Sequence, residues 1–166
     1  MEIVKASLKD VVLINKLAEQ VWGPTYKDIL SVAQLEYMFG MMYSPKSITE
    51  QLEIKGHQFL LIKDETNYYG FASYEINYKP EITKIHKLYV LPQLQGKGVG
   101  RLLLAAIERE ARNNRNTIIT LNVNRFNTAL NFYNKTGFIK TGTEDIDIGR
   151  GYLMEDYIME KEMHSI

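Results

Sequence analysis

The segment LYVLPQLQGKGVGRLLL, residues 88–104, links two apolar runs through a proline and three alternate glycines, Gly96, Gly98 and Gly100. The first run is typical of a strand and the second of a helix. Glycines between a strand and a helix let a ligand approach the backbone, because they carry no Cβ atom. The helix start adds unpaired N–H groups and the positive end of a dipole. This pattern favours a phosphate-binding loop, with an ordinary glycine turn as the alternative.

Two common phosphate loops do not fit this segment. The P-loop requires Gly-Lys followed by Ser or Thr, whereas this chain reads GKGVGR. The dinucleotide-binding fingerprint requires a different glycine spacing and an acidic residue about 20 positions later, where this chain has Ile118, Ile119 and Thr120. The glycines therefore indicate a third class of loop.

The composition favours one soluble domain, residues 1–166, because 45% of the residues are hydrophobic. Basic and acidic residues balance at 20 each, so no overall charge draws the chain to nucleic acid or an anionic membrane. Lys97 lies between Gly96 and Gly98 and Arg101 follows Gly100, so these cations more simply face phosphates than form a nucleic-acid surface. The absence of cysteine excludes disulfides, thiolate nucleophiles and cysteine-bound metals.

The chain shows no signal for a membrane or a metal. Its N-terminus lacks a basic region with a cleavage site, and no apolar run approaches the roughly 20 residues of a membrane span. We therefore expect a cytoplasmic protein. His57, His86 and His164 occur without an HExxH motif or a cluster of carboxylate ligands, so we expect no metal site.

The predicted elements begin with a strand at 2–6 and three helices. Each helix follows a Ser-x-x-Asp/Gln/Glu capping pattern, at residues 7–10, 31–34 and 47–50, and Gly56 closes the third. Antiparallel strands follow at 57–64, 68–79 and 81–91, then a helix at 100–114, a strand at 117–123, a helix at 127–136 and strands at 138–144 and 151–163. This order indicates a mixed sheet with helices on both faces.

Two motifs carry a resemblance to a known family. The spacing QxxGxG at residues 95–100, after LYVLP and before a helix, resembles the acetyl-coenzyme A pyrophosphate loop of the GNAT superfamily of N-acetyltransferases. The segment LNVNRFNTALNFYNKTGF resembles a later motif of that superfamily, with Ala129, Tyr133 and a closing Gly-Phe. The first third and the tail GYLMEDYIMEKEM are similar to the bacterial polyamine acetyltransferases of the PaiA type.

The resemblance implies an α/β fold, a GNAT-like mixed, mostly antiparallel sheet of about seven strands flanked by helices on both faces. It also implies direct transfer of an acetyl group from acetyl-coenzyme A to an amine. Leu88, Tyr89 and Val90 would pair with the pantetheine arm as a strand does, and an amide near Tyr89 or Val90 would face the thioester carbonyl. The pyrophosphate would be held by the loop residues Gln95, Gly96, Lys97, Gly98, Val99, Gly100 and Arg101.

The resemblance also suggests one further cofactor contact and the general acid. Phe126 occupies the family's usual asparagine position, so the cofactor contact passes to Asn127 or to Asn124. Tyr133 matches the general acid that would protonate the leaving thiolate, since a thiol has a pKa of roughly 8.5 and a phenol one near 10. A packing role is the alternative for Tyr133.

A general base is needed because a primary amine arrives as an ammonium ion. Glu75 and His86, on strands that lead into the expected site, are the candidates, and the alternative is that both are ordinary surface or satisfied polar residues.

The acceptor would be a small amine such as spermidine or spermine. Candidates for an aromatic wall are Trp22, Tyr26, Tyr37 and Tyr43, although their spacing suits a core equally well. The acidic residues of the tail would either attract a polycation or form a solvated edge; they are Glu144, Asp145, Asp147, Glu155 and Asp156. Of these, Asp156 is our candidate for substrate binding. The alternatives are a protein N-terminus or lysine as acceptor, and a non-catalytic acyl-coenzyme A sensor. Homodimers are common in the families that this chain resembles, so a homodimer is a further expectation.

Overall fold

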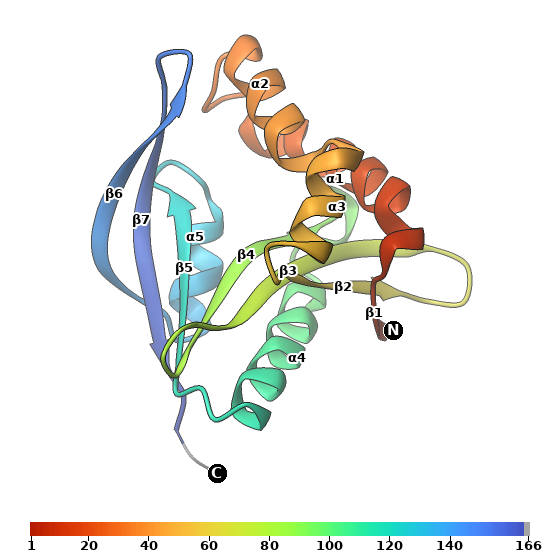
Figure 1. Ribbon diagram of the computed structural model, residues 1–166, viewed down its shortest axis with the longest axis vertical. Coiled ribbons are helices and arrows are strands. Elements are labelled where there is room, and N and C mark those ends of the chain that lie inside the picture. Colours follow the sequence, from red (N-terminus) through yellow and green to blue (C-terminus); the bar gives the residue numbers. More distant parts are fainter. Residues whose placement is uncertain (165–166) are drawn as a thin grey trace. The chain divides into compact units, whose positions relative to one another are not determined.

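The structure, a computed structural model, describes residues 1–164. Its Cα atoms group into two compact units. Unit 1 comprises Met1–Glu75 and Lys87–Ile107, and unit 2 comprises Ile76–His86 and the residues from Glu108 onward. Strands β3 (Tyr68–Lys79) and β4 (Ile82–Val90), in the yellow-green part of Figure 1, contribute residues to both units.

The helices of unit 1 begin close to the predicted positions. A short 3-10 turn, η1 (Leu8–Asp10), leads into α1 (Val11–Tyr26), and the Ser7 N–H donates to the Asp10 carboxylate at 2.9 Å. Helix α2 (Val32–Tyr43) begins after Ser31, whose Oγ accepts from the Gln34 N–H at 3.1 Å. Both predicted starts are thus confirmed in their capping contacts.

The predicted cap of the third helix is wrong by one turn. Helix α3 (Pro45–Glu53) is capped by Ser44, whose Oγ accepts from the Ser47 N–H at 3.2 Å. Proline suits the first helical position, because its fixed φ is helical and its missing N–H would have no helical partner there. Gly56 follows the helix with a φ of +73°, in agreement with its predicted role at the C-terminal end.

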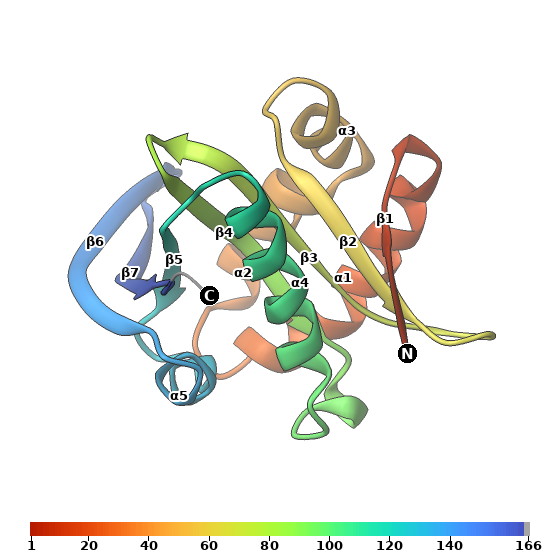
Figure 2. The same ribbon diagram turned by 90° about the horizontal axis from the view of Figure 1, so that it is seen from below.

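The strands of unit 1 carry its core. Strand β1 (Glu2–Lys5) pairs antiparallel with β2 (Gln58–Lys63), and β2 pairs antiparallel with β3, with a register shift at Ile62/Lys63. Side chains of these strands such as Phe59, Leu61 and Phe71 are buried, and the Phe71 ring packs against Tyr43 of α2 with centroids 6.1 Å apart. In the view of Figure 2, the first half of α4 (Val99–Asn113) lies in front of the unit 1 parts of β3 and β4, while α1 and α2 lie behind these strands.

Unit 2 is built on β5 (Ile118–Asn124), α5 (Ala129–Lys135), β6 (Ile139–Gly149) and β7 (Tyr152–Glu162). Residues Ile82–Ile85 of β4 pair in parallel with Ile118–Leu121 of β5, whereas β5–β7 and β6–β7 are antiparallel. The full strand order is β1-β2-β3-β4-β5-β7-β6. The predicted mixed, mostly antiparallel seven-stranded sheet is therefore confirmed. Strand β6 runs five residues beyond its predicted end at 144.

Among the described residues, none of the helices combines the length and the apolar character that crossing a bilayer requires.

Candidate functional site

The glycine segment forms a loop that ends at a helix start, as predicted. After the 3-10 turn η2 (Pro92–Leu94), Gly96 and Gly98 adopt φ values of +78° and +82°, in the left-handed region that glycine tolerates best. A Cβ atom at either position would meet no atom within 4 Å, so open space lies beside the loop backbone. The third glycine, Gly100, lies inside the first turn of α4.

Buried apolar side chains hold the first two turns of α4 against the core. Val99, Leu103 and Ile107 are buried, whereas Lys97 and Arg101 are exposed. The first N–H groups of an α-helix have no partner within the helix, and here they adjoin two exposed cationic side chains. Exposed donors, positive charge and a Cβ-free loop together suit a pyrophosphate group.

The loop is tied back to β4 and β3. Gln95 Nε2 donates to the Val90 carbonyl oxygen at 3.3 Å, and the Leu91 N–H donates to the Tyr69 carbonyl oxygen at 2.9 Å. Gly70 lies so close to β4 that a Cβ atom there would be 2.5 Å from the Tyr89 carbonyl oxygen. The segment Leu88–Val90 is therefore held at close range by its neighbour strand.

Aromatic residues from α1 and α2 gather around Tyr89. The ring centroid of Trp22 lies 4.6 Å from that of Tyr26, 5.3 Å from that of Tyr43 and 6.4 Å from that of Tyr89. The hydroxyl groups of Tyr26 and Tyr89 are 3.2 Å apart. Three of the four aromatic candidates thus contact one another beside the predicted cofactor strand, while Tyr37 is half-buried elsewhere on α2.

Polar atoms within this aromatic cluster are deeply buried. Trp22 is 2% exposed and Tyr43 is fully buried. Burial raises the pKa of Tyr43 well above its ordinary value and the nearby Tyr26 adds to this effect, while hydrogen bonding with Trp22 and Tyr89 opposes it. The Tyr43 hydroxyl therefore stays protonated at any ordinary pH.

Two polar pairs of unit 1 were not foreseen from the sequence. His57 Nε2 lies 3.6 Å from the carboxylate of Glu75, a base candidate. Lys87 is only 7% exposed, and its Nζ donates to Gln51 Oε1 at 2.6 Å. In the strand pattern ITKIHKLYV, Lys87 shares a face with Ile85 and Tyr89, but lysine usually faces water, and the contact with Gln51 of α3 accompanies its burial.

In unit 2, Tyr133 is buried between aromatic neighbours. Its ring centroid lies 5.2 Å from that of Phe132 and 5.5 Å from that of Phe138. The base candidate His86 packs edge-on against Tyr78, with centroids 6.3 Å apart.

Both candidate asparagines shape the turn between β5 and α5. Asn124 Oδ1 accepts from the Phe126 N–H, and buried Asn127 Oδ1 accepts from the Ala129 N–H, each at 2.9 Å. Their side-chain oxygens thus stabilise the backbone that leads into the helix of Tyr133.

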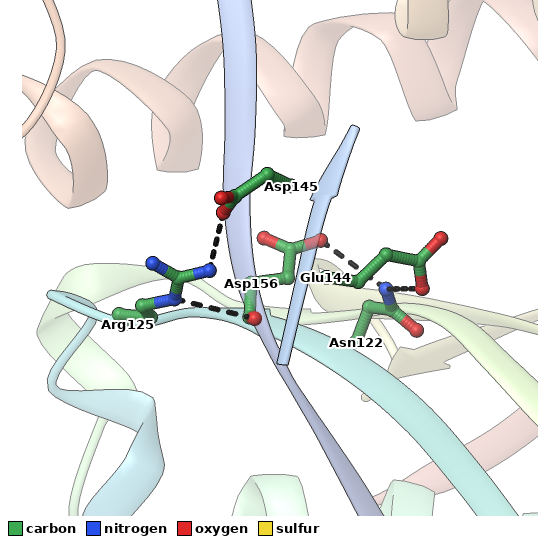
Figure 3. Close-up of polar contacts among 5 residues, drawn as sticks. All are labelled: Asn122, Arg125, Glu144, Asp145 and Asp156. Carbon is green, nitrogen blue, oxygen red and sulfur yellow. Dashed lines mark hydrogen bonds and ion pairs between the residues drawn. The ribbon is translucent and has the colours of Figure 1, made fainter. Parts of the chain in front are cut away.

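Of the acidic tail residues, Asp156 alone is buried, and it lies beside Glu144. Asp156 of β7 lies opposite Glu144 of β6 in the sheet register. Asn122 Nδ2 donates to both carboxylates, to Glu144 Oε2 at 3.2 Å and to Asp156 Oδ2 at 3.4 Å (Figure 3). Asp156 is 3% exposed, whereas Glu144 is exposed. Asp147 and Glu155 are exposed.

Arg125 approaches this group from the end of β5. Its guanidinium donates to the Asp145 carboxylate, and its Nε donates to the backbone oxygen of Asp156 at 3.4 Å (Figure 3). Within residues 1–164 the Asp156 carboxylate itself forms no ion pair. Burial raises the pKa of Asp156, and the Glu144 charge adds to the rise, while Asn122, Arg125 and Lys84 oppose it.

Comparisons with known proteins agree with the resemblance found in the sequence. A family model described as an acetyltransferase (GNAT) domain matches residues 25–160. The spermidine N(1)-acetyltransferase of Thermoplasma acidophilum is 26% identical over 170 residues, which cover 99% of both chains. The structure of the PaiA N-acetyltransferase of Thermoplasma acidophilum, in complex with coenzyme A, is 26% identical with a TM-score of 0.82 over 98% of each chain.

A more distant structure shares the fold alone. The ribosomal-protein-S18-alanine N-acetyltransferase of Escherichia coli is 16% identical with a TM-score of 0.73, over 99% of this chain and 95% of its own. The family match spans most of the chain, and the glycine loop at the start of α4 suits the pyrophosphate of the family's acetyl donor, acetyl-coenzyme A. The chain belongs to the GNAT family and is an N-acetyltransferase.

Proposed function

We propose that this N-acetyltransferase moves the acetyl group of acetyl-coenzyme A to a primary amine of a polyamine such as spermidine or spermine. The observation that carries the proposal is the buried carboxylate of Asp156, which shares the amide of Asn122 with Glu144. The full-length similarity to a spermidine N(1)-acetyltransferase supports the same class of acceptor.

The charges around Asp156 favour a cationic ligand. A buried carboxylate is costly unless a cation or several hydrogen bonds compensate it. Arg125 is paired with Asp145, and Asn122 supplies a dipole in place of a charge. An ammonium group would supply the missing positive charge, and the exposed Glu144 would strengthen its attraction. A polyamine carries more than one such group, so one ammonium can bind while another amine reacts.

We assign the acetyl donor to unit 1. The backbone of Gln95–Arg101 would hold the pyrophosphate, and Leu88–Val90 would pair with the pantetheine arm. Asn127 would add a contact to the donor. Bound acetyl-coenzyme A supplies an activated thioester, and an amide N–H at Tyr89 or Val90 would stabilise the charge that develops on its carbonyl oxygen.

We assign the proton transfers to residues of both motifs. Tyr133 would donate a proton to the departing thiolate. Glu75 and His86 are the candidates for the group that removes a proton from the acceptor ammonium. The contact of Glu75 with His57 gives that carboxylate a neighbour able to carry positive charge.

The aromatic cluster of Trp22, Tyr26 and Tyr43 would border the acceptor, as would Tyr37. Rings of this kind attract alkylammonium groups through their electron-rich faces. Because the first three residues are buried, their contribution would be to shape the inner wall, with Tyr89 connecting this wall to the cofactor strand.

A thiol-release assay with acetyl-coenzyme A tests this function. The acceptor panel contains spermidine, spermine, simple diamines, amino acids, lysine peptides and peptides with a free N-terminal alanine. We expect the highest kcat/KM for spermidine or spermine. Turnover confined to peptides would overturn the polyamine proposal and favour a protein acceptor.

A further inference from the structure

We propose that Lys87 is a positioning residue for acetyl transfer: its neutral side chain holds the strand segment Leu88–Val90 in place, and its protonation releases that segment. The inference rests on the proposed role of Leu88–Val90 in binding the acetyl donor.

The side chain of Lys87 is enclosed by three elements. Its Nζ donates to Gln51 Oε1 of α3 at 2.6 Å and lies 5.5 Å from the ring centroid of Tyr43 and 5.7 Å from that of Phe59. Only 7% of the residue is exposed. The tip of Lys87 is therefore held by one neutral acceptor and lies over the faces of two aromatic rings.

The surroundings of Lys87 offer no negative charge. Within residues 1–164, Lys87 forms no ion pair. The charged group that acts on it is Lys55, which has the same sign, and Tyr43 on α2 remains a neutral phenol. Burial, with a further contribution from Lys55, lowers the pKa of Lys87 from 10.5 to about 7. A substantial neutral fraction thus exists at neutral pH.

The strand beyond Lys87 tolerates little movement. Tyr89, two residues on, has its carbonyl oxygen against Gly70 and its hydroxyl 3.2 Å from that of Tyr26. At the end of the segment the Leu91 N–H donates to the Tyr69 carbonyl oxygen at 2.9 Å. Displacement of β4 at Lys87 therefore changes contacts along the whole segment.

Protonation supplies a reason for such displacement. A buried ammonium with one hydrogen bond and two ring faces, but no counter-charge, is still less well compensated than in water, and the side chain gains by moving toward solvent. To do so it leaves Gln51 and both rings, and we expect the backbone of β4 at residue 87 to shift with it. The neutral form is thus the one that is compatible with the described strand.

Calorimetric titration with coenzyme A at pH 6, 7 and 8 tests this coupling. Two variants are compared with the wild type: Lys87→Met, which fills the site with an uncharged chain, and Gln51→Glu, which gives the ammonium a carboxylate partner. The cofactor's own phosphate titrates with a pKa near 6, but it does so equally in all three proteins. Differences between the proteins therefore isolate Lys87.

We expect the wild-type affinity to fall about tenfold more than that of either variant between pH 8 and pH 6. This factor is the change in the neutral fraction of an amine whose pKa is about 7. Equal pH dependence in all three proteins would overturn the proposal. So would a Lys87→Met variant that binds coenzyme A normally but loses turnover at every pH, because Lys87 would then take part in proton transfer itself.

A second readout does not depend on the acetyl donor. Carbon NMR titration of the lysine side chains, with Lys87→Met to assign the resonance, measures the pKa of Lys87 directly. Titration near neutral pH supports the proposal, and titration above pH 10 overturns it. Failure of the polyamine proposal leaves both tests intact, since neither uses an acceptor amine, and a complete lack of coenzyme A binding would instead contradict the assigned cofactor loop.

Discussion

The carbonyl oxygen of Tyr89 lies 2.5 Å from the position that a Cβ atom of Gly70 would occupy. The Val90 Cα atom lies 3.2 Å from the same position. Both neighbours are backbone atoms, which cannot rotate away. Strand β3 therefore has to carry glycine here for β4 to come this close. The placement of the segment Leu88–Val90 depends on the absence of a side chain at Gly70.

Replacement of Gly70 by alanine should displace β4. We expect a loss of about 1–3 kcal/mol in the free energy of unfolding, which is typical of overpacking, together with weaker binding of coenzyme A. Urea unfolding and calorimetry measure the two effects. Gly40→Ala is the control, because Gly40 is helical and an added Cβ meets no atom within 4 Å. Normal stability and binding in Gly70→Ala would show that the strands can separate freely.

Replacement of Gly98 by valine should abolish binding of coenzyme A while leaving the protein folded. Valine is strained at the φ of +82° that Gly98 adopts, and its branched side chain would fill the open space beside the loop. Gly56→Val is the matched control, because Gly56 has a φ of +73° and equally open surroundings on another loop. Calorimetry should separate the two variants, and equal binding by both would refute the loop assignment.

Replacement of Tyr133 by phenylalanine should lower kcat by roughly 10²–10⁴, the usual contribution of a general acid. The buried ring contacts with Phe132 and Phe138 stay in place, so the variant should fold normally. Steady-state kinetics at saturating acceptor measures the effect, and circular dichroism controls for the fold. A kcat within twofold of the wild type would assign Tyr133 a packing role alone.

Lys87 should make the stability of the protein depend on pH. Its pKa is 10.5 in the unfolded chain and about 7 in the folded chain. Above pH 10.5 both states are neutral there, and as pH falls toward 7 the unfolded state takes up the proton first and is favoured. The free energy of unfolding should thus rise between pH 7 and pH 10.5, by at most about 1.4 kcal/mol per pH unit. Below pH 7 Lys87 is protonated in both states, so its contribution to the free energy of unfolding no longer changes with pH.

Urea unfolding of the wild type and of Lys87→Met at pH 7, 8 and 9 measures this difference. The methionine variant should be the more stable protein at pH 7, and the two curves should converge as the pH rises. Curves that run parallel would mean that Lys87 has an ordinary pKa in the folded protein.

Replacement of Asp156 by asparagine should raise the KM for spermidine by roughly tenfold or more, because an ammonium group would lose its buried partner. The control is Glu155→Gln, which removes the same charge from the exposed neighbouring residue of β7. A smaller effect is expected there, since solvent screens an exposed charge. Equal effects in both variants would indicate general attraction by the acidic strand and no specific contact at Asp156.

Local sequence patterns predicted most of the fold. The capping contact of Ser31 and the glycine loop ahead of α4 depend on residues close in sequence, which is why they could be anticipated. The start of α3 was misplaced because two serines three positions apart both suit a cap, and Pro45 decides between them. The extension of β6 to Gly149 depends on pairing with β7, which its own composition does not reveal.

The environment of the polar residues could not be predicted in the same way. Strand alternation puts Lys87 on one face with Ile85 and Asp156 on one face with Met154, but charged residues usually face water, so the residue type argued for exposure. Their burial follows from α3 over one residue and from β5 and β6 beside the other. Both contacts join residues more than 30 positions apart, a distance at which sequence patterns carry no information about neighbours.

The position of Trp22 gives the protein a built-in fluorescent reporter. It is the only tryptophan in the sequence, and it lies almost completely buried, 6.4 Å by ring centroids from Tyr89. Its emission spectrum therefore depends on the packing of one place in the molecule, at the strand segment assigned to the acetyl donor. Ligand binding and pH changes that move β4 should alter this emission, so that they can be followed in real time without any label.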